Sequence, residues 1–248
     1  MPRNMPRKQA GFTLVEIAIV LVIIGLLLGG VLKGQELIQS AKVKNVVNDF
    51  SSVTAAIYGY QDRYKALPGD DTGTGRWTGL ATPITAGNGD GVINGGTGTA
   101  CAFTDPTATT SGVDECFLIW SDLRQAGFIT GALNSGPPLN AYNGQLGVQD
   151  GIGAFQSGSA TNNTPGTMAA GGTAGTGFKG PVICESNIPD KGAIAIDNQL
   201  DDGNPSTGSI RAVAQAGATG AVTLVAGGAA DATYVENGTT YYTICKAM

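Results

Sequence analysis

Residues 12–32 form an apolar segment that only a few kinds of structure can accommodate. The segment has 21 residues and a single charged side chain, Glu16. At a rise of about 1.5 Å per residue, a helix of this length spans about 30 Å, which is the thickness of the hydrocarbon core of a bilayer. The sequence therefore predicts a helix that lies in a membrane at some stage.

The charges before this segment predict its orientation. Arg3, Arg7 and Lys8 precede it, and the positive-inside rule places such a basic end in the cytoplasm. The remainder of the chain is then expected on the other side of the inner membrane. Residues 1–11 form a leader that carries three positive charges, so its removal changes the formal net charge from −5 to −8.

The helical pattern continues beyond the apolar segment without a break. Apolar residues recur at spacings of three and four positions until shortly before Pro68: Val43, Val46, Phe50, Val53, Ile57, Tyr60 and Tyr64. This period is that of an amphipathic helix. We therefore expect one helix over residues 12–66, apolar all round in its first half and amphipathic in its second. A secretory signal explains neither this continuity nor a charge inside the apolar core.

Residues 67–248 are expected to form a globular head. They contain 33 of the 39 glycines of the chain, a composition that suits a small sheet with long loops. Residue patterns predict helices over 116–126 and 188–200, and strands over 145–155, 181–185, 209–214, 221–226 and 240–245. The predicted fold class is α+β. A long N-terminal helix, first membrane-spanning and then amphipathic, packs on a small antiparallel sheet in this fold.

A distinctive motif stands at the start of the apolar segment. Lys8-Gln-Ala-Gly11 is followed by Phe12-Thr-Leu-Val-Glu16, so that a basic leader, a glycine, an aromatic residue, a glutamate and an apolar run appear in that order. This order resembles the processing site of type IV prepilins and of the pseudopilins of type II secretion. The resemblance implies that prepilin peptidase cleaves between Gly11 and Phe12 and methylates the new amino group of Phe12. It also implies that pilus assembly machinery packs many identical or homologous helices into the core of a helical filament.

Glu16 is the one charge inside the apolar segment. On insertion scales a carboxylate within a membrane helix costs about 2.5–3.5 kcal/mol. Simple anchoring gains nothing from this charge, so we expect Glu16 to have a partner. Residues four apart lie on one helix face, which makes the Phe12 amine of the same chain a candidate. The family resemblance implies instead the Phe12 amine of a neighbouring subunit, so that Glu16 serves assembly.

Three hypotheses for function follow from these observations. The first is a structural subunit of a type IV pilus-like extracellular filament, held in the inner membrane as a precursor. The second is a type II secretion pseudopilin in a periplasm-spanning filament. Lys33 stands where many major pilins have a helix-breaking proline, which leaves these two hypotheses open. The third, from another class, is a monomeric binding module anchored in the inner membrane, which retains residues 1–11.

The composition argues against an enzyme and against binding of nucleic acid. The chain has no histidine, which excludes Ser-His-Asp and Cys-His nucleophilic sites and His-ligated metal ions. Its net charge of −5 lacks the basic footprint expected of a nucleic-acid-binding domain. The GxGxxG match at residues 175–180 does not stand between a strand and a helix, as a nucleotide site requires. Asp197 with Asp201 and Asp202 is interpreted as a helix end and a turn rather than as a glycosidase carboxylate pair.

The chain has four cysteines, Cys101, Cys116, Cys184 and Cys245, and no CxxC motif, which argues against a zinc site. An extracytoplasmic head favours their oxidation to disulfides. We predict the pair Cys101–Cys116, which closes a local loop, and the pair Cys184–Cys245, which ties the last strand to a central one.

Two oxygen-rich loops make calcium the one cofactor that we consider; no other is expected. Asn88 and Asp90 stand in a sequence that resembles the middle of a calcium loop, but both anchoring carboxylates of an EF-hand loop are absent. Asp201 and Asp202 belong to the second loop. The ordinary alternative is that the Asn-Gly and Asp-Gly pairs form turns without any ion.

Overall fold

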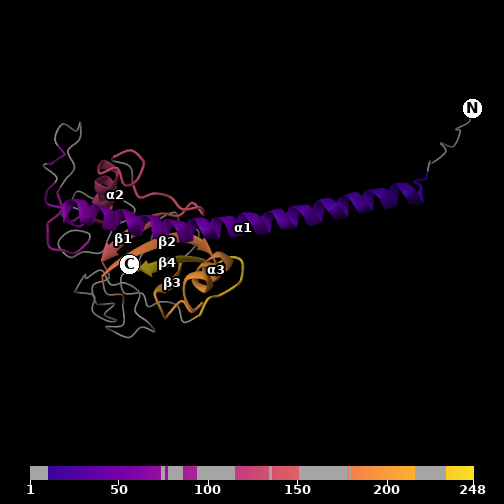
Figure 1. Ribbon diagram of the computed structural model, residues 1–248. Coiled ribbons are helices and arrows are strands. Elements are labelled where there is room, and N and C mark those ends of the chain that lie inside the picture. The colour runs from indigo at the N-terminus through magenta and orange to yellow at the C-terminus, as the bar shows by residue number, and fades with distance from the viewer. Residues whose placement is uncertain are drawn as a thin grey trace, which may run out of the picture. The chain divides into compact units, whose positions relative to one another are not determined.

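The longest element of the structure is helix α1, Leu14–Tyr64, with 51 residues (Figure 1). The prediction of one helix over residues 12–66 is therefore confirmed to within two residues at each end. The helix begins directly after Thr13 and ends before Lys65, whose φ of 57° lies in the left-handed region that ends many helices. Pro68 follows shortly afterwards and prevents the helix from resuming.

The computed structural model describes residues 11–73, 76–77, 86–93, 115–133, 136–150, 178, 180–215 and 233–248. The chain divides into two compact units, Met1–Ala41 and Lys42–Met248. The first half of α1 belongs to the first unit and the second half to the other. Most of the predicted leader, residues 1–10, lies outside the described residues.

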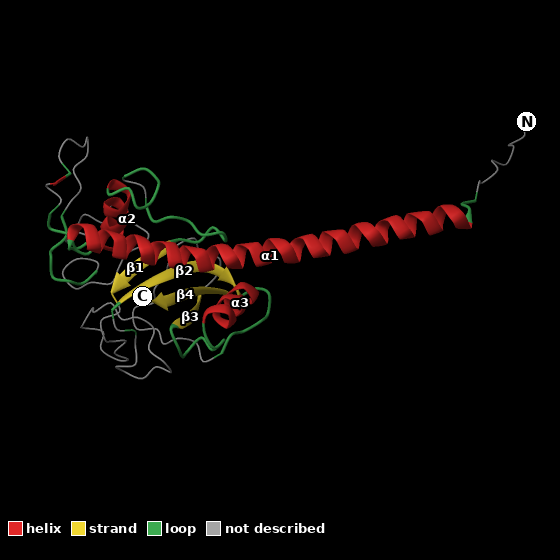
Figure 2. Ribbon diagram, in the orientation of Figure 1, coloured by secondary structure: helices red, strands yellow, loops and turns green. Residues whose placement is uncertain are grey.

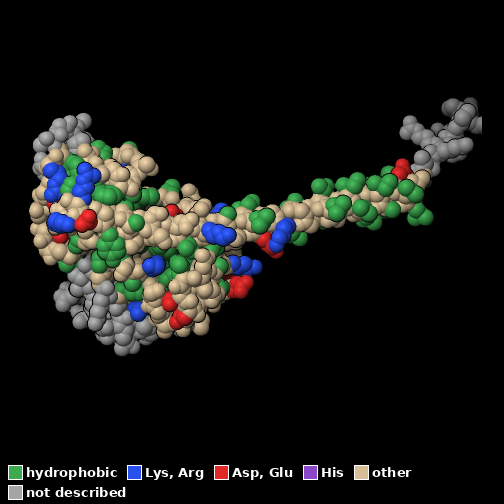
Figure 3. Space-filling model, viewed as in Figure 1, with side chains coloured by type: hydrophobic (Ala, Val, Ile, Leu, Met, Phe, Trp, Pro, Cys, Tyr) green, Lys and Arg blue, Asp and Glu red, His purple; other side chains and the backbone are tan. Residues whose placement is uncertain are grey.

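The first half of α1 is apolar on all sides. Among the described residues, α1 is the one helix that is long and apolar enough to cross a membrane, and none of its most apolar 18-residue window is buried. Figure 3 shows hydrophobic side chains all along this half of the helix. Gly25, Gly29, Gly30 and Gly34 lie within the same stretch, and a Cβ added at any of them would meet nothing within 4 Å. The first unit therefore presents its apolar residues outward.

The second half of α1 is amphipathic, as its sequence predicts. Its buried residues are Val43, Val46, Phe50, Val53, Ala56, Ile57 and Tyr60. They repeat the predicted apolar stripe, with Ala56 added and with Tyr64 only partly buried. These side chains belong to one hydrophobic core that also includes residues of the sheet and of the two short helices.

A four-stranded antiparallel sheet forms the centre of the second unit (Figure 2). Its strands are β1 (Leu146–Asp150), β2 (Pro181–Pro189), β3 (Ile210–Gln215) and β4 (Tyr241–Ala247), in the spatial order β1-β2-β4-β3. The described part of the chain also contains helices α2 (Glu115–Gln125) and α3 (Asp190–Leu200). The predicted α+β class is confirmed.

The predicted boundary between β2 and α3 is wrong by two residues. The helix was expected over 188–200, but Ile188 and Pro189 pair with Tyr242 and Tyr241 of β4 and so belong to the strand. A bulge between Glu185 and Ile188 lets the strand continue beyond its predicted end. The predicted strand over 221–226 and the second half of the one over 145–155 lie outside the described residues.

The Cys184–Cys245 disulfide is present in the structure. The two residues stand directly opposite each other in the register of β2 and β4, with their Cα atoms 4.0 Å apart. Cys116 is also disulfide-bonded. Its predicted partner, Cys101, lies outside the described residues.

Removal of the Cys184–Cys245 disulfide should lower the free energy of unfolding by about 4 kcal/mol, because the bond closes a long loop in the unfolded chain. We expect this loss in a Cys184→Ala, Cys245→Ala double variant of the full chain in detergent, measured by urea unfolding. Both thiols are buried, so alanine introduces no buried polar group. A loss below about 1 kcal/mol would contradict the loop-closure argument.

Candidate functional site

The start of α1 is organised by hydrogen bonds between Thr13 and Glu16. The backbone N–H of Thr13 donates to Glu16 Oε2 at 2.8 Å, and the Thr13 hydroxyl donates to the same oxygen at 2.7 Å. In return, the backbone N–H of Glu16 donates to Thr13 Oγ1 at 3.3 Å. This reciprocal pattern is a capping box, which satisfies amide groups that an α-helix leaves without partners in its first turn.

The capping box gives Glu16 a structural role that our sequence analysis missed. The signal was present, since Thr and Glu three positions apart before an apolar run are the signature of this cap. The expectation that simple anchoring gains nothing from Glu16 is therefore corrected, because the carboxylate also stabilises the start of its own helix. Both Thr13 groups donate to Oε2, so both bonds of the cap go to one of the two carboxylate oxygens of Glu16.

The predicted cleavage point lies just outside the helix. Gly11 and Phe12 precede Leu14, the first residue of α1, and the Phe12 side chain is 85% exposed. A Cβ added at Gly11 would meet nothing within 4 Å. The bond between these two residues thus lies in exposed chain outside the helix, where a peptidase can bind it without first unwinding the helix.

Large apolar side chains surround Glu16 and continue along the helix. The exposed ones are Phe12, Leu14, Val15, Ile17, Ile19, Val20, Leu21, Val22, Ile23, Ile24, Leu26, Leu27, Leu28, Val31, Leu32, Leu37 and Ile38. A contiguous apolar surface of this size is not stable in water. It requires either a bilayer or the apolar surfaces of other helices.

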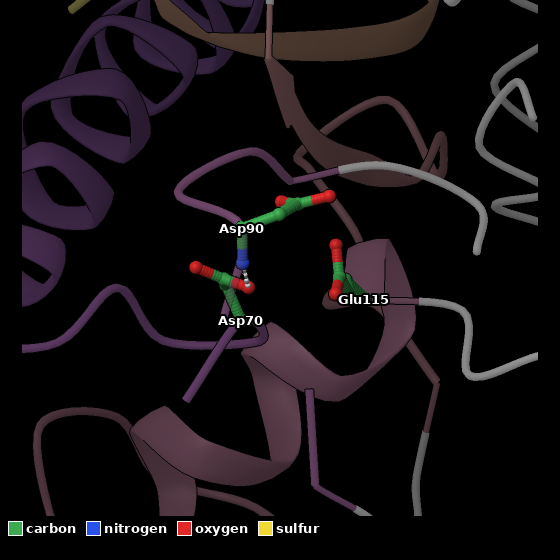
Figure 4. A group of neighbouring side chains, drawn as sticks. All are labelled: Asp70, Asp90 and Glu115. Carbon is green, nitrogen blue, oxygen red and sulfur yellow. Dashed lines mark hydrogen bonds between the residues drawn. The ribbon is translucent and has the colours of Figure 1, made fainter. Parts of the chain in front are cut away.

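A group of carboxyl groups lies in the second unit, near the end of α1. Asp70, Asp90 and Glu115 each offer an oxygen, and these oxygens lie within 4.8 Å of one another (Figure 4). The predicted calcium residue Asp90 is therefore joined by Asp70 and Glu115, which the sequence analysis did not single out. Asn88 takes part differently, since its backbone N–H donates to Glu115 at 3.1 Å and its side-chain amide donates to Asp90 at 3.0 Å.

Asp70 already accepts several backbone hydrogen bonds. Its Oδ1 accepts from the N–H groups of Gly89 and Asp90, at 2.6 and 3.0 Å, and its Oδ2 accepts from the N–H of Gly91 at 2.9 Å. The side chain therefore holds the turn 89–91 in place. Burial is the largest influence on this carboxyl and raises its pKa, while the backbone donors lower it.

The second predicted pair, Asp201 and Asp202, forms a similar group with Asp197. Each carboxylate has a local partner: Asp197 accepts from the hydroxyl of Tyr234 at 2.7 Å, and Asp201 accepts from the backbone N–H of Ile210 at 2.8 Å. Asp202 likewise accepts from the hydroxyl of Thr207 and the backbone N–H of Asn204. The Asp197 bond ties α3 to the segment before β4, and the Asp201 bond ties the end of α3 to the start of β3.

Calcium binding at these two groups remains a prediction. Millimolar calcium should raise the thermal midpoint of the full chain, and Asp90→Asn should reduce that rise by removing one ligand of the first group. Without calcium, Asp70→Asn should lower the free energy of unfolding by about 1–3 kcal/mol, because an amide NH₂ cannot accept all three backbone bonds. A thermal midpoint that does not respond to calcium, together with no heat of binding by calorimetry, would contradict the calcium prediction.

Another buried carboxyl group lies near the C-terminal end of α1. Asp122 of α2 accepts a hydrogen bond from the backbone N–H of Gly69 at 2.7 Å, while its Oδ1 has no partner among the described residues. Asp71 accepts from the Tyr60 hydroxyl at 2.7 Å and forms an ion pair with Arg76. Burial raises the pKa of Asp122 to about 7, and the negative charge of Asp71 adds to the increase.

The raised pKa of Asp122 should make the stability of the head depend on pH. An unfolded aspartate has a pKa of about 3.9, so the folded state binds more protons than the unfolded state between about pH 4 and pH 7. The stabilisation is complete below pH 4 and is lost as the pH rises through 7, by up to about 4 kcal/mol.

We expect Asp122→Asn to reduce this loss when urea unfolding of the full chain in detergent is followed from pH 4.5 to pH 8. Asp62→Asn is a suitable control, because the Asp62 side chain is exposed and pairs only with Lys65 at the surface. An unchanged pH profile in Asp122→Asn would show that Asp122 is ionised throughout this range.

Comparison with known proteins gives a match at the N-terminal end of the chain. Residues 6–32 match a family model described as the prokaryotic N-terminal methylation motif. This range includes Gly11, Phe12 and the Thr13–Glu16 cap. Neither the curated proteins nor the solved structures gave a match to the chain. The chain therefore carries the N-terminal signature of type IV pilins and pseudopilins.

Proposed function

We propose that this protein is a structural subunit of a type IV pilus-like extracellular filament. Prepilin peptidase cleaves it between Gly11 and Phe12 and methylates Phe12, and the first half of α1 then packs into the filament core. One observation carries the proposal: a single continuous helix exposes apolar residues on all sides in its first half and is packed into a folded head in its second. The methylation motif at the start of the same helix supports it.

The exposed apolar surface explains how such a subunit moves from membrane to filament. In the inner membrane the lipid chains cover the first half of α1, and in a filament the helices of other subunits cover it. Both surroundings are apolar, so the hydrophobic effect changes little during the transfer. Close packing and polar contacts between helices must then favour the filament.

Glu16 is the polar contact that we assign to assembly. Cleavage converts the backbone nitrogen of Phe12 into a charged amine, but the N–H of Thr13 remains an amide, so the capping box persists in the processed subunit. The carboxylate of Glu16 can then hold its own helix start through Oε2 and accept the Phe12 amine of a neighbouring subunit. The pair neutralises two charges that would otherwise be isolated in an apolar core, and it sets the axial position of each incoming subunit.

Two alternatives make different use of the same helix. A type II secretion pseudopilin forms a periplasm-spanning filament, so electron microscopy of sheared surface material distinguishes it from a pilus. The glycine-rich head with its long loops fits an exposed fibre coat better than a periplasmic one. A monomeric module anchored in the inner membrane keeps residues 1–11, which mass spectrometry of the native N-terminus detects.

Variants of Glu16 test the proposal. A glutamine preserves the capping box, because Thr-x-x-Gln caps a helix as Thr-x-x-Glu does, but it removes the charge. We expect Glu16→Gln to be processed and inserted normally and to lower the yield of sheared filaments by more than about tenfold, since one buried charge loses its partner at a cost of about 3–5 kcal/mol. Glu16→Ala, which also removes the cap, should behave the same way or worse.

The matched control is Glu36→Gln, which removes an exposed glutamate of the same helix that pairs with Lys33. It should leave the filament yield unchanged. If Glu16→Gln assembles normally while Glu16→Ala does not, the cap rather than the charge is required. Normal yield from both variants at equal expression would rule out a role of Glu16 in assembly.

A further inference from the structure

Glu185 is buried in the centre of the head. It lies in β2, where it stands opposite Leu146 of β1 and Ile244 of β4, and its side chain is 0% exposed. Neither of its carboxyl oxygens has a hydrogen-bond partner among the described residues. The side-chain amide of Asn140 donates to the backbone oxygen of Ser186 at 2.9 Å, and it also lowers the pKa of Glu185.

The charged group that acts on Glu185 comes from α1. Asp49, which directly precedes the buried Phe50 in the second half of α1, repels a negative charge on Glu185. Both residues belong to the unit Lys42–Met248. The negative charges of these two carboxyl groups would therefore repel each other within the same folded unit.

Two cations, one on α1 and one on β4, have contacts of their own. Lys42 of α1 lies 5.1 Å from the centre of the Tyr142 ring, and Lys246 of β4 donates to a backbone oxygen at 3.3 Å. The ion pairs in the described part of the chain include neither Glu185 nor Asp49. The facing residues of β1 and β4, Leu146 and Ile244, are apolar.

An ionised carboxylate in this position is unfavourable. Burial of a charge without a partner costs several kcal/mol, and such a group takes up a proton instead. Burial raises the pKa of Glu185 well above its usual range, and Asp49 adds to the increase, while Asn140 lowers it slightly. The buried surroundings of Glu185 therefore favour its neutral form.

We propose that Glu185 is a proton-linked latch, which keeps the second half of α1 packed on the sheet while it is protonated and favours release of the helix when it ionises. The latch involves only the unit Lys42–Met248, so it does not depend on the proposed filament function. The folded head holds the proton more tightly than the opened head. The contribution of Glu185 to the stability of the packed helix is therefore complete below the ordinary pKa of a glutamate. It is lost as the pH rises towards the higher pKa of the packed state.

Hydrogen–deuterium exchange of the full chain in detergent micelles tests this proposal. Peptides that cover residues 43–60 report the opening of α1 once their exchange is corrected for the intrinsic effect of pH. All variants carry Asp122→Asn, so that Asp122, whose carboxyl group also has a raised pKa, does not titrate in this experiment. We expect the protection of 43–60 in this parent to fall by up to about tenfold per pH unit between pH 5.5 and the pKa of Glu185 in the packed state, because opening releases one proton.

Two variants separate the latch from a general loss of stability. Glu185→Gln imitates the protonated side chain, so residues 43–60 should stay protected at all pH values. Asp49→Asn removes the repulsion, so Glu185 should ionise at a lower pH. The fall in protection should therefore also end at a lower pH. Glu236→Gln, a matched control at an exposed glutamate of the same unit, should behave like the parent. Protection in the parent that is independent of pH, or a fall that persists in Glu185→Gln, would overturn the proposal.

Discussion

The continuity of helix α1 is the constraint on which the rest of the structure depends. Every residue from Leu14 to Tyr64 is helical, although the surroundings required by the side chains change completely from Lys33 onward. Before that point apolar groups face all directions, and after it they form one stripe that ends at Tyr60. Backbone hydrogen bonds run without a break through this change. Contacts made by the apolar half and contacts made by the head therefore act on one and the same helix.

The head must hold its long loops in place although it has few charged residues. Only 13% of the chain is charged, and buried aspartates serve mainly as acceptors for backbone N–H groups. Asp70 accepts from three residues of one turn, and Asp190 accepts from Lys191, Asn237 and Gly238. A carboxylate with two oxygens can satisfy several amides that would otherwise be buried without partners. The acidic character of the head thus follows in part from the needs of its loops.

Residues whose role depends on local spacing were predictable from the sequence, and residues whose role depends on distant neighbours were not. The stripe from Val43 to Tyr60 is visible because a helix repeats every 3.6 residues. The strand that contains Glu185 was expected to end at that residue, since the polar run that follows carries no alternating pattern. Only pairing with β4 beyond the bulge extends it to Pro189. Asp70 and Glu115 likewise escaped notice because they stand far from Asp90 in the sequence, and only the fold brings the three carboxyl groups together.

Glu16 and Glu185 show why residue type alone does not determine what a carboxyl group does. Glu16 accepts two hydrogen bonds from Thr13, which stabilise a carboxylate and fix its direction at the start of the helix. Neither carboxyl oxygen of Glu185 has a hydrogen-bond partner among the described residues, and burial together with the negative charge of Asp49 favours the neutral acid. The same side chain is therefore suited to receive a cation at one end of α1 and to release a proton beneath the other half. The donors that surround each carboxyl decide between these roles, and for Glu185 those surroundings exist only once the helix has packed on the sheet.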